Sequence, residues 1–276
     1  MKAVPTLILM VLVVAVATPA LAGSVDYEAM KLAYSLQLDK SVVVVIHGAY
    51  YGTGWWVSKS YVITAAHVVG YASGITVELL HGTWRSSGIV IGVDRKHDIA
   101  VIRVANPMPG AKILAIANEV RKGMEIIVIG YPNELYKLTG SIEVMSNNPR
   151  ASFGHIDWVD SERGIFEIGA KTDTGNSGGP VLERNSLAVV GLVSFALPGD
   201  VAPWMYYATL SKYIVEDLRK WGVPFRVVDV TKVSEYGTLG LGTQVSKEKV
   251  IIAAAGGLAA LLVGIIIGMS VRGGRR

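Results

Sequence analysis

The alternation of apolar and polar positions divides the chain into two apolar ends and a long middle region. From Ser41 onward, short β-branched runs are separated by Gly, Pro, Asn and charged residues, as expected for strands joined by turns. No helical pattern separates these runs, so they predict an all-β antiparallel barrel or sandwich rather than a parallel α/β sheet. The predicted strands are 42–46, 61–66, 75–80, 89–93, 99–104, 126–130, 141–145 and 189–195.

Two segments beside these strands have a helical period instead. Residues 23–40 carry an imperfect apolar face, and Asp26 stands where a helix N-cap is expected. Residues 210–221 are amphipathic, because their large apolar side chains recur at intervals of three or four. We therefore expect one helix before the β-rich region and one at its end.

The two ends of the chain predict export and a membrane anchor. Residues 1–22 have a basic start, an apolar run and a small-residue cleavage pattern, which is typical of a secretory signal peptide; an uncleaved anchor is the alternative. Residues 250–271 contain no charged side chain and, at about 1.5 Å per residue, are long enough to cross a bilayer. The arginines of 272–276 favour the cytoplasmic side. Together these segments predict a single-pass protein of the cell membrane, with its middle region outside the cytoplasm.

The predicted organisation follows from these boundaries. A connector joins the β-rich region to the span, and Gly264 and Gly268 have a spacing at which two spans could pack, giving a homo-oligomer. The segments are 1–22 (signal peptide), 23–40 (helical segment), 41–224 (β-rich domain), 225–249 (connector), 250–271 (transmembrane helix) and 272–276 (basic cytoplasmic tail).

Charge and cysteine content exclude several functions. The formal charge is +4, but six of the 26 basic residues and one of the 22 acidic residues lie outside residues 23–246, so this region is close to neutral. It therefore predicts no nucleic-acid partner. The chain has no cysteine, which excludes disulfides, thiol catalysis and zinc–thiolate sites. No metal-ligand spacing stands out either, and neither a metal nor a cofactor is predicted.

Three strings in the β-rich region carry candidate chemistry: TAAHV around His67, HDIAVI around Asp98 and GNSGGP around Ser177. A serine hydroxyl needs a base to remove its proton during attack, and histidine suits that role. A carboxylate behind the ring fixes its tautomer. Glycines beside the serine let backbone N–H groups turn toward a developing oxyanion, and Gly175 and Ser177 are the candidate donors.

These strings resemble the three signature blocks of trypsin-like serine proteases, in that family's order of His, Asp and Ser. The resemblance covers about residues 41–221. The longer stretches GTGWWVSKSYVITAAHVV and VDRKHDIAVIRV are most similar to the HtrA/Deg group. The chain departs from that group in lacking room for a PDZ domain after the protease domain.

The resemblance implies a fold and a set of site residues. The fold is two antiparallel β-barrels with the active site between them, followed by a C-terminal helix. His67, Asp98 and Ser177 would form the catalytic triad, with the oxyanion hole at the N–H groups of Gly175 and Ser177. The pocket for the residue before the cleaved bond would take small or aliphatic side chains, or acidic ones as the alternative. Its predicted residues are Lys171, Thr172, Ser194, Phe195, Ala196 and Met205.

The expected function is that of a membrane-anchored serine endopeptidase, which hydrolyses peptides or unfolded proteins outside the cytoplasm through an acyl-enzyme. Two alternatives stay open: a catalytically weak peptide-binding module on the same fold, and an esterase. Asn176 is neutral where digestive relatives carry an acidic residue, and we expect its amide to hydrogen-bond neighbouring backbone and hold the turn.

The other histidines have structural or surface interpretations. We expect His47 to be structural, His81 to lie in a solvated turn, and His97 to point away from Asp98. His155, in the polar stretch 146–164, is expected at the surface or at the substrate rim.

Overall fold

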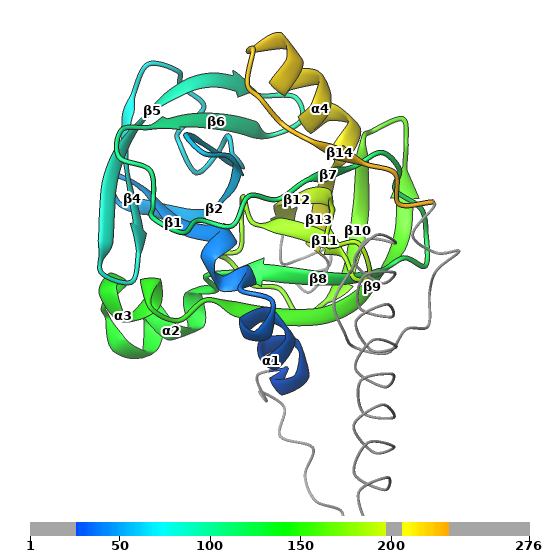
Figure 1. The fold of residues 1–276 in the computed structure, drawn as a ribbon, viewed down its shortest axis with the longest axis horizontal. Helices are drawn as coiled ribbons and strands as arrows, with labels where there is room; N and C mark the ends of the chain where they lie inside the picture. The colour runs from blue at the N-terminus through cyan, green and yellow to red at the C-terminus, as the bar shows by residue number, and fades with distance from the viewer. Residues whose placement is uncertain (1–25, 197–205, 232–276) are drawn as a thin grey trace, which may run out of the picture. The chain divides into compact units, whose positions relative to one another are not determined.

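Two closed antiparallel β-barrels form most of the chain described by the computed structural model, which covers residues 26–196 and 206–231 (Figure 1). The predicted signal peptide and the predicted span 250–271 lie outside these residues. Within the described ranges, no helix is both long enough and apolar enough to cross a membrane. The predicted two-barrel, all-β fold is confirmed.

The first barrel has the strand order β1-β2-β3-β6-β5-β4, and the antiparallel pairing of β1 with β4 closes it. Four of its strands agree with the predicted runs to within one residue at each end, whereas β2 was not predicted because two glycines interrupt its pattern. The strands are β1 (Val42–His47), β2 (Tyr50–Ser58), β3 (Tyr61–Ala65), β4 (Thr76–His81), β5 (Trp84–Asp94) and β6 (Ile99–Val104).

The second barrel has the order β11-β8-β9-β10-β13-β12, and β11 pairs with both β8 and β12 to close it. Two short strands, β7 (Ile116–Ala117) and β14 (Val227–Val228), extend it by parallel pairing beside β12. The barrel strands are β8 (Glu125–Gly130), β9 (Arg150–Asp160), β10 (Ile165–Ala170), β11 (Pro180–Glu183), β12 (Val189–Ala196) and β13 (Tyr206–Leu210).

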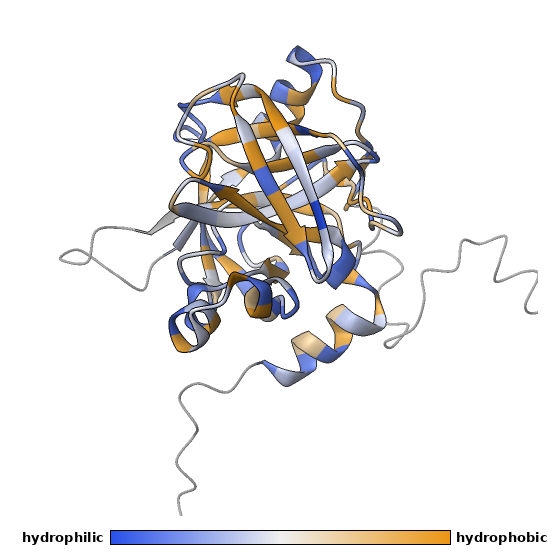
Figure 2. Cartoon of the chain, turned by 90° about the vertical axis from the view of Figure 1, so that its left-hand side faces the viewer, coloured by the Kyte–Doolittle hydropathy of each residue, from blue (hydrophilic) through white to orange (hydrophobic). Residues whose placement is uncertain are grey.

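The apolar core explains why these strands form. Figure 2 shows apolar residues along the barrel strands, while hydrophilic residues gather at turns and on the outer faces of helices. Successive side chains of a strand point to opposite faces, yet Trp55 and Trp56 on β2 are both fully buried. Other residues therefore cover both faces of strand β2 at this point.

Both predicted helices are present. Helix α1 (Tyr27–Ser35) begins at Asp26, whose carboxylate accepts the Ala29 N–H at 3.0 Å as an N-cap. A short 3-10 turn, η1 (Leu38–Ser41), leads into β1. Helix α4 (Ser211–Lys220) buries Ile214 and Leu218 and lies beside the β5–β6 hairpin in Figure 1.

The prediction of a strand at 141–145 was wrong. The chain forms two short helices there, α2 (Asn133–Thr139) and α3 (Ile142–Ser146). Ser141 caps α3 by accepting the Val144 N–H at 3.2 Å, and Glu143 lies in the first turn, where a negative charge is favourable. The local capping residues therefore outweigh the β-branched composition of this segment.

Candidate active site

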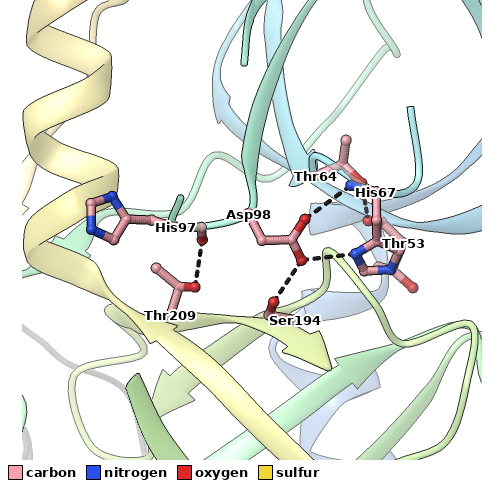
Figure 3. A network of polar contacts seen from close by, with 7 residues as sticks. All are labelled: Thr53, Thr64, His67, His97, Asp98, Ser194 and Thr209. Atoms are coloured by element: carbon pink, nitrogen blue, oxygen red, sulfur yellow. Dashed lines mark hydrogen bonds and ion pairs between the residues drawn. The ribbon is translucent and has the colours of Figure 1, made fainter. Parts of the chain in front are cut away.

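His67 and Asp98 meet at one end of the first barrel. His67 follows β3 and Asp98 precedes β6, and the pairing of these two strands brings the residues together. His67 Nδ1 lies 2.8 Å from Asp98 Oδ2, and the His67 backbone N–H donates to Asp98 Oδ1 at 2.9 Å (Figure 3). One carboxylate thus holds both the ring and the backbone of the histidine. A proton on Nδ1 would leave Nε2 free to act as a base.

Ser194 adds a third hydrogen bond to the same carboxylate. Its hydroxyl donates to Asp98 Oδ2 at 2.6 Å, and its side chain comes from β12 in the second barrel (Figure 3). Ser194 is only 2% exposed. Its side chain joins the two barrels at Asp98, and its predicted place in the substrate pocket stays a prediction.

The turn that carries Ser177 packs directly on the first barrel. Gly175 and Gly178 have φ values of 94° and 85°, a conformation that favours glycine. A Cβ atom on Gly178 would lie 2.2 Å from Thr53 O and 2.7 Å from Ala65 N, so only glycine fits there. The contact at Ala65 places half-buried Ser177 next to the segment that carries His67.

Within the described residues, the Ser177 hydroxyl makes no hydrogen bond to the His67 ring. Hydrogen bonds of this type are often long without substrate and tighten when substrate binds. The backbone of Ser177 is nevertheless fixed, because its carbonyl accepts the Thr53 N–H at 2.8 Å.

The backbone N–H groups of this turn fall into two sets. Those of Asn176, Gly178 and Gly179 donate to carbonyls of the turn and of β12, at 2.7–3.0 Å. Those of Gly175 and Ser177 donate to no acceptor in the described parts of the chain. The turn therefore keeps two unused donors on either side of Asn176, at the positions predicted for an oxyanion hole.

Thr53 holds this turn in place, and the sequence analysis did not identify it. Thr53 is fully buried on β2. Its Oγ1 donates to Gly175 O at 2.7 Å and accepts the Tyr131 N–H at 3.0 Å. Together with the bond to Ser177 O, these contacts make Thr53 a cross-barrel clamp. The available signal was a polar residue between two glycines just before the histidine string.

Replacing Thr53 with valine is expected to weaken both folding and hydrolysis. The change leaves Gly175 O and Tyr131 N–H buried without partners, and each such group costs about 1–3 kcal/mol. We expect the free energy of unfolding in urea to fall by about 2–4 kcal/mol, and kcat/KM to fall about tenfold or more as the turn shifts. Thr53→Ser keeps the hydroxyl and should preserve most of both. Equal losses in the two variants would show that the hydroxyl is not what matters.

Asn176 differs from its predicted role. Its side chain is 5% exposed, and Oδ1 is buried without a hydrogen-bond partner among the described residues. This oxygen lies against Gly130, where an added Cβ would be 2.8 Å away. The predicted hydrogen bond from the side-chain amide to neighbouring backbone is therefore absent among the described residues, and Thr53 holds the turn instead.

Lys171 and Thr172 lie in one loop directly after β10. The Lys171 ammonium is 3.4 Å from Glu134 Oε1, and Thr172 Oγ1 donates to Ala170 O at 3.2 Å. Both residues line a small cavity of about 50 Å³ with Asp26, Pro132, Arg150 and Asn176, among others, and no described β12 residue borders it. Phe195 and Ala196 pair with β13 through their backbones. The side chains of these two residues, and Met205 as a whole, lie outside the part of the chain that the structure describes.

The remaining histidines are placed as follows. His81 is not in a solvated turn: it ends β4, its Nδ1 lies 2.8 Å from Tyr131 Oη, and burial lowers its pKa. His155 is exposed on β9 beside Asp157, as expected for a surface residue. His97 points away from His67, toward α4 (Figure 3). Within residues 26–196 and 206–231, no group of His, Asp or Glu side chains could hold a metal ion.

The chain matches a known protein family. A family model described as "Trypsin-like peptidase domain" matches residues 52–192, about half of the chain. The chain belongs to this family. The match begins in β2, next to Thr53, and ends in β12, two residues before Ser194.

Within the family, the relatives include HtrA-type serine proteases. The chain is 32% identical over 170 residues to serine protease HTRA4 of Homo sapiens, covering 56% of this chain and 35% of that protein. It is 30% identical over 152 residues to serine protease Rv3671c of Mycobacterium tuberculosis, covering 54% and 37%. The chain thus spans about a third of the length of these relatives.

A solved structure supports the same fold. The crystal structure of the Rv3671c protease in its active form superimposes with a TM-score of 0.56 at 23% identity, covering 75% of this chain and 91% of that one.

Proposed function

We propose that the chain is a serine endopeptidase with His67, Asp98 and Ser177 as its catalytic triad. The observation that carries this proposal is the His67–Asp98 pair, held by two hydrogen bonds beside a turn that presents a serine and two unused N–H donors. Membership of the trypsin-like peptidase family supports the same conclusion.

The proposed reaction proceeds through an acyl-enzyme. Ser177 Oγ attacks the peptide carbonyl carbon while its proton passes to His67 Nε2, and Asp98 stabilises the resulting imidazolium. The carbonyl oxygen becomes an oxyanion and accepts hydrogen bonds from the N–H groups of Gly175 and Ser177. The imidazolium then protonates the leaving amine. A water molecule, deprotonated by the same ring, hydrolyses the acyl-enzyme.

Covalent labelling tests this function against its alternatives. A fluorophosphonate probe should label the wild-type chain at Ser177, and casein or unfolded peptides should be cleaved. A peptide-binding module would bind peptides but would not be labelled. An esterase would be labelled and would turn over small esters without cleaving peptides.

The proposed substrates are peptides cleaved after small or aliphatic residues. The alternative preference for acidic residues depends on a free positive charge on Lys171, but the ion pair with Glu134 partly neutralises this charge. Profiling of cleavage sites on a proteome-derived peptide library tests the choice. Dominant cleavage after arginine, lysine or large aromatic residues would rule out both preferences.

We also propose that residues 250–271 anchor the protease domain to the cell membrane, with the domain outside the cytoplasm. Truncation after Lys247 should then release a soluble protein with full activity, because the triad and every described strand, β14 included, precede residue 229. Fractionation in high salt, followed by an activity assay of each fraction, measures this. A truncated protein that stays with the membrane would exclude residues 250–271 as the sole anchor.

A further inference from the structure

A second group of titratable side chains lies behind Asp98, on the side away from His67. Asp94 ends β5, His97 precedes Asp98, and Tyr213 and Asp217 belong to α4. His97 Nδ1 lies 2.5 Å from Asp94 Oδ2, and both side chains are less than one-fifth exposed. The His97 ring stacks on Tyr213 with centroids 3.7 Å apart and planes 13° apart. The imidazole is therefore held between β5 and α4.

Two polar atoms in this group are buried without a partner among the described residues: His97 Nε2 and Asp217 Oδ2. Asp217 as a whole is 7% exposed. Such atoms are uncommon, because burying an unsatisfied polar group is costly, and a buried unpaired charge costs more still. A protonated Asp217 would avoid most of this cost.

The group is coupled to Asp98 through the backbone. Asp98 has φ 56°, a left-handed conformation that Asp tolerates better than most residues with a Cβ but that still costs free energy unless neighbouring contacts hold it. The adjacent His97 carbonyl accepts the Thr209 hydroxyl at 2.6 Å (Figure 3). The contact between α4 and β5 continues at Trp221, whose ring would be 2.3 Å from a Cβ on Gly92.

We propose that His97, held between Asp94 and helix α4, is a positioning residue that keeps Asp98 in its left-handed conformation. Protonated Asp217 keeps α4 packed against His97. This inference rests on the proposed role of Asp98 in the triad. It assigns a function to residues that contact neither substrate nor the reacting atoms.

The charges around Asp217 set the pH at which the contact changes. Burial raises the pKa of Asp217 to about 7, and the nearby charge of Asp94 adds to the rise. On α4, Lys220 opposes this rise and Glu216 adds to it. Burial also raises the pKa of Asp94, but hydrogen bonds from His97 and the backbone outweigh that effect and leave it lowered. Asp94 is therefore ionised first, and above about pH 7 a second carboxylate forms beside it.

Asp217→Asn should differ from the wild type in two ways, in the pH dependence of its stability and in that of its kcat. Between about pH 4 and 7, folded Asp217 keeps a proton that the unfolded chain loses, so wild-type stability falls relative to the variant. The difference in melting temperature should grow over this interval and stay constant above it. In the native state the second charge appears near pH 7, so kcat of the wild type should fall about fivefold relative to the variant between pH 6 and 8.5.

Glu216→Gln is the matched control, because it removes a charge from the neighbouring, exposed position of the same helix. Its pH profiles of kcat and of melting temperature should keep the wild-type shape with only a small shift to lower pH, because Glu216 is the weakest of the groups that raise the Asp217 pKa. Parallel profiles for Asp217→Asn and the wild type would overturn the role of Asp217.

Two His97 variants test the positioning role itself. His97→Ala should lower kcat about tenfold with KM changed less than twofold. His97→Phe keeps the stack on Tyr213 but loses the bond to Asp94, and should lower kcat by less. Unchanged kcat in a folded His97→Phe would show that the bond to Asp94 is not needed to position Asp98. Unchanged kcat in both variants would exclude the proposal.

The melting temperature of Asp217→Asn, measured against pH in a chain that also carries Ser177→Ala, tests this proposal separately from the proposed function. The stability effect of Asp217→Asn needs no catalysis, so it should persist there. If it is absent, the inference about Asp217 fails while the triad stands. If Ser177→Ala retains activity, the triad fails while the stability effect remains interpretable.

Discussion

The variant Ser177→Ala should lose hydrolysis almost completely and keep its fold. The hydroxyl makes no hydrogen bond to the His67 ring, and Ser177 is held through its carbonyl bond to Thr53, which alanine preserves. We expect kcat to fall about 10⁵–10⁶-fold, leaving the residual rate that the oxyanion hole and substrate binding supply. The melting temperature should stay close to that of the wild type.

The measurement compares initial rates on casein and on a cleaved peptide, together with fluorophosphonate labelling and thermal unfolding. Ser161→Ala is a suitable control, because it removes the hydroxyl of an exposed serine in the β9–β10 turn. Labelling that persists in Ser177→Ala would place the nucleophile elsewhere.

Asp98→Asn should have the second-largest effect, because every contact of this carboxylate requires an acceptor. Oδ1 accepts the His67 backbone N–H, and Oδ2 accepts from Ser194 and faces His67 Nδ1. An amide nitrogen at the Oδ1 position would face the His67 N–H donor. At the Oδ2 position it would face Nδ1 and favour the tautomer with its proton on Nε2, which cannot accept the Ser177 proton.

We therefore expect a loss in kcat of about 10⁴-fold near pH 7. Substrate binding should change little, so KM and kcat measured separately test the interpretation. Ser194→Ala is the comparison. It removes one of three hydrogen bonds and keeps the tautomer, so its loss should be far smaller. A loss of the same size in Ser194→Ala would show that orientation, rather than tautomer, dominates.

The sequence predicted those parts of the site that depend on neighbouring residues. His67, Asp98 and Ser177 stand in strings whose glycines, strand ends and polar residues are visible locally. Ser194 and Thr53 could not be found in this way, because their partners Asp98 and Gly175 lie 96 and 122 residues away. Each contact depends on how the two barrels meet, which no local pattern encodes.

The fold shows the same division between local and distant information. Runs with clear β-branched composition became strands at nearly the predicted bounds. The segment 150–160 was missed because polar residues interrupt its apolar pattern, although its backbone pairs with β8 over 150–155 and with β10 over most of 154–160. The error at 141–145 had the opposite cause, since local capping by Ser141 decided the outcome there.

The short parallel pairing of β14 with β7 has a mechanical consequence. After α4, the chain returns to the second barrel, where the Ile116 N–H donates to Arg226 O at 2.8 Å and the Asn118 N–H donates to Val228 O at 3.0 Å. The Val230 N–H also donates to the Asn118 side chain. A pull on the chain beyond residue 231 would load these bonds first and pass into β7 and β12. Helix α4 would thus carry no tension at first. A pull on the tail would reach His97 and Asp98 only after the hydrogen bonds between β14 and β7 had broken.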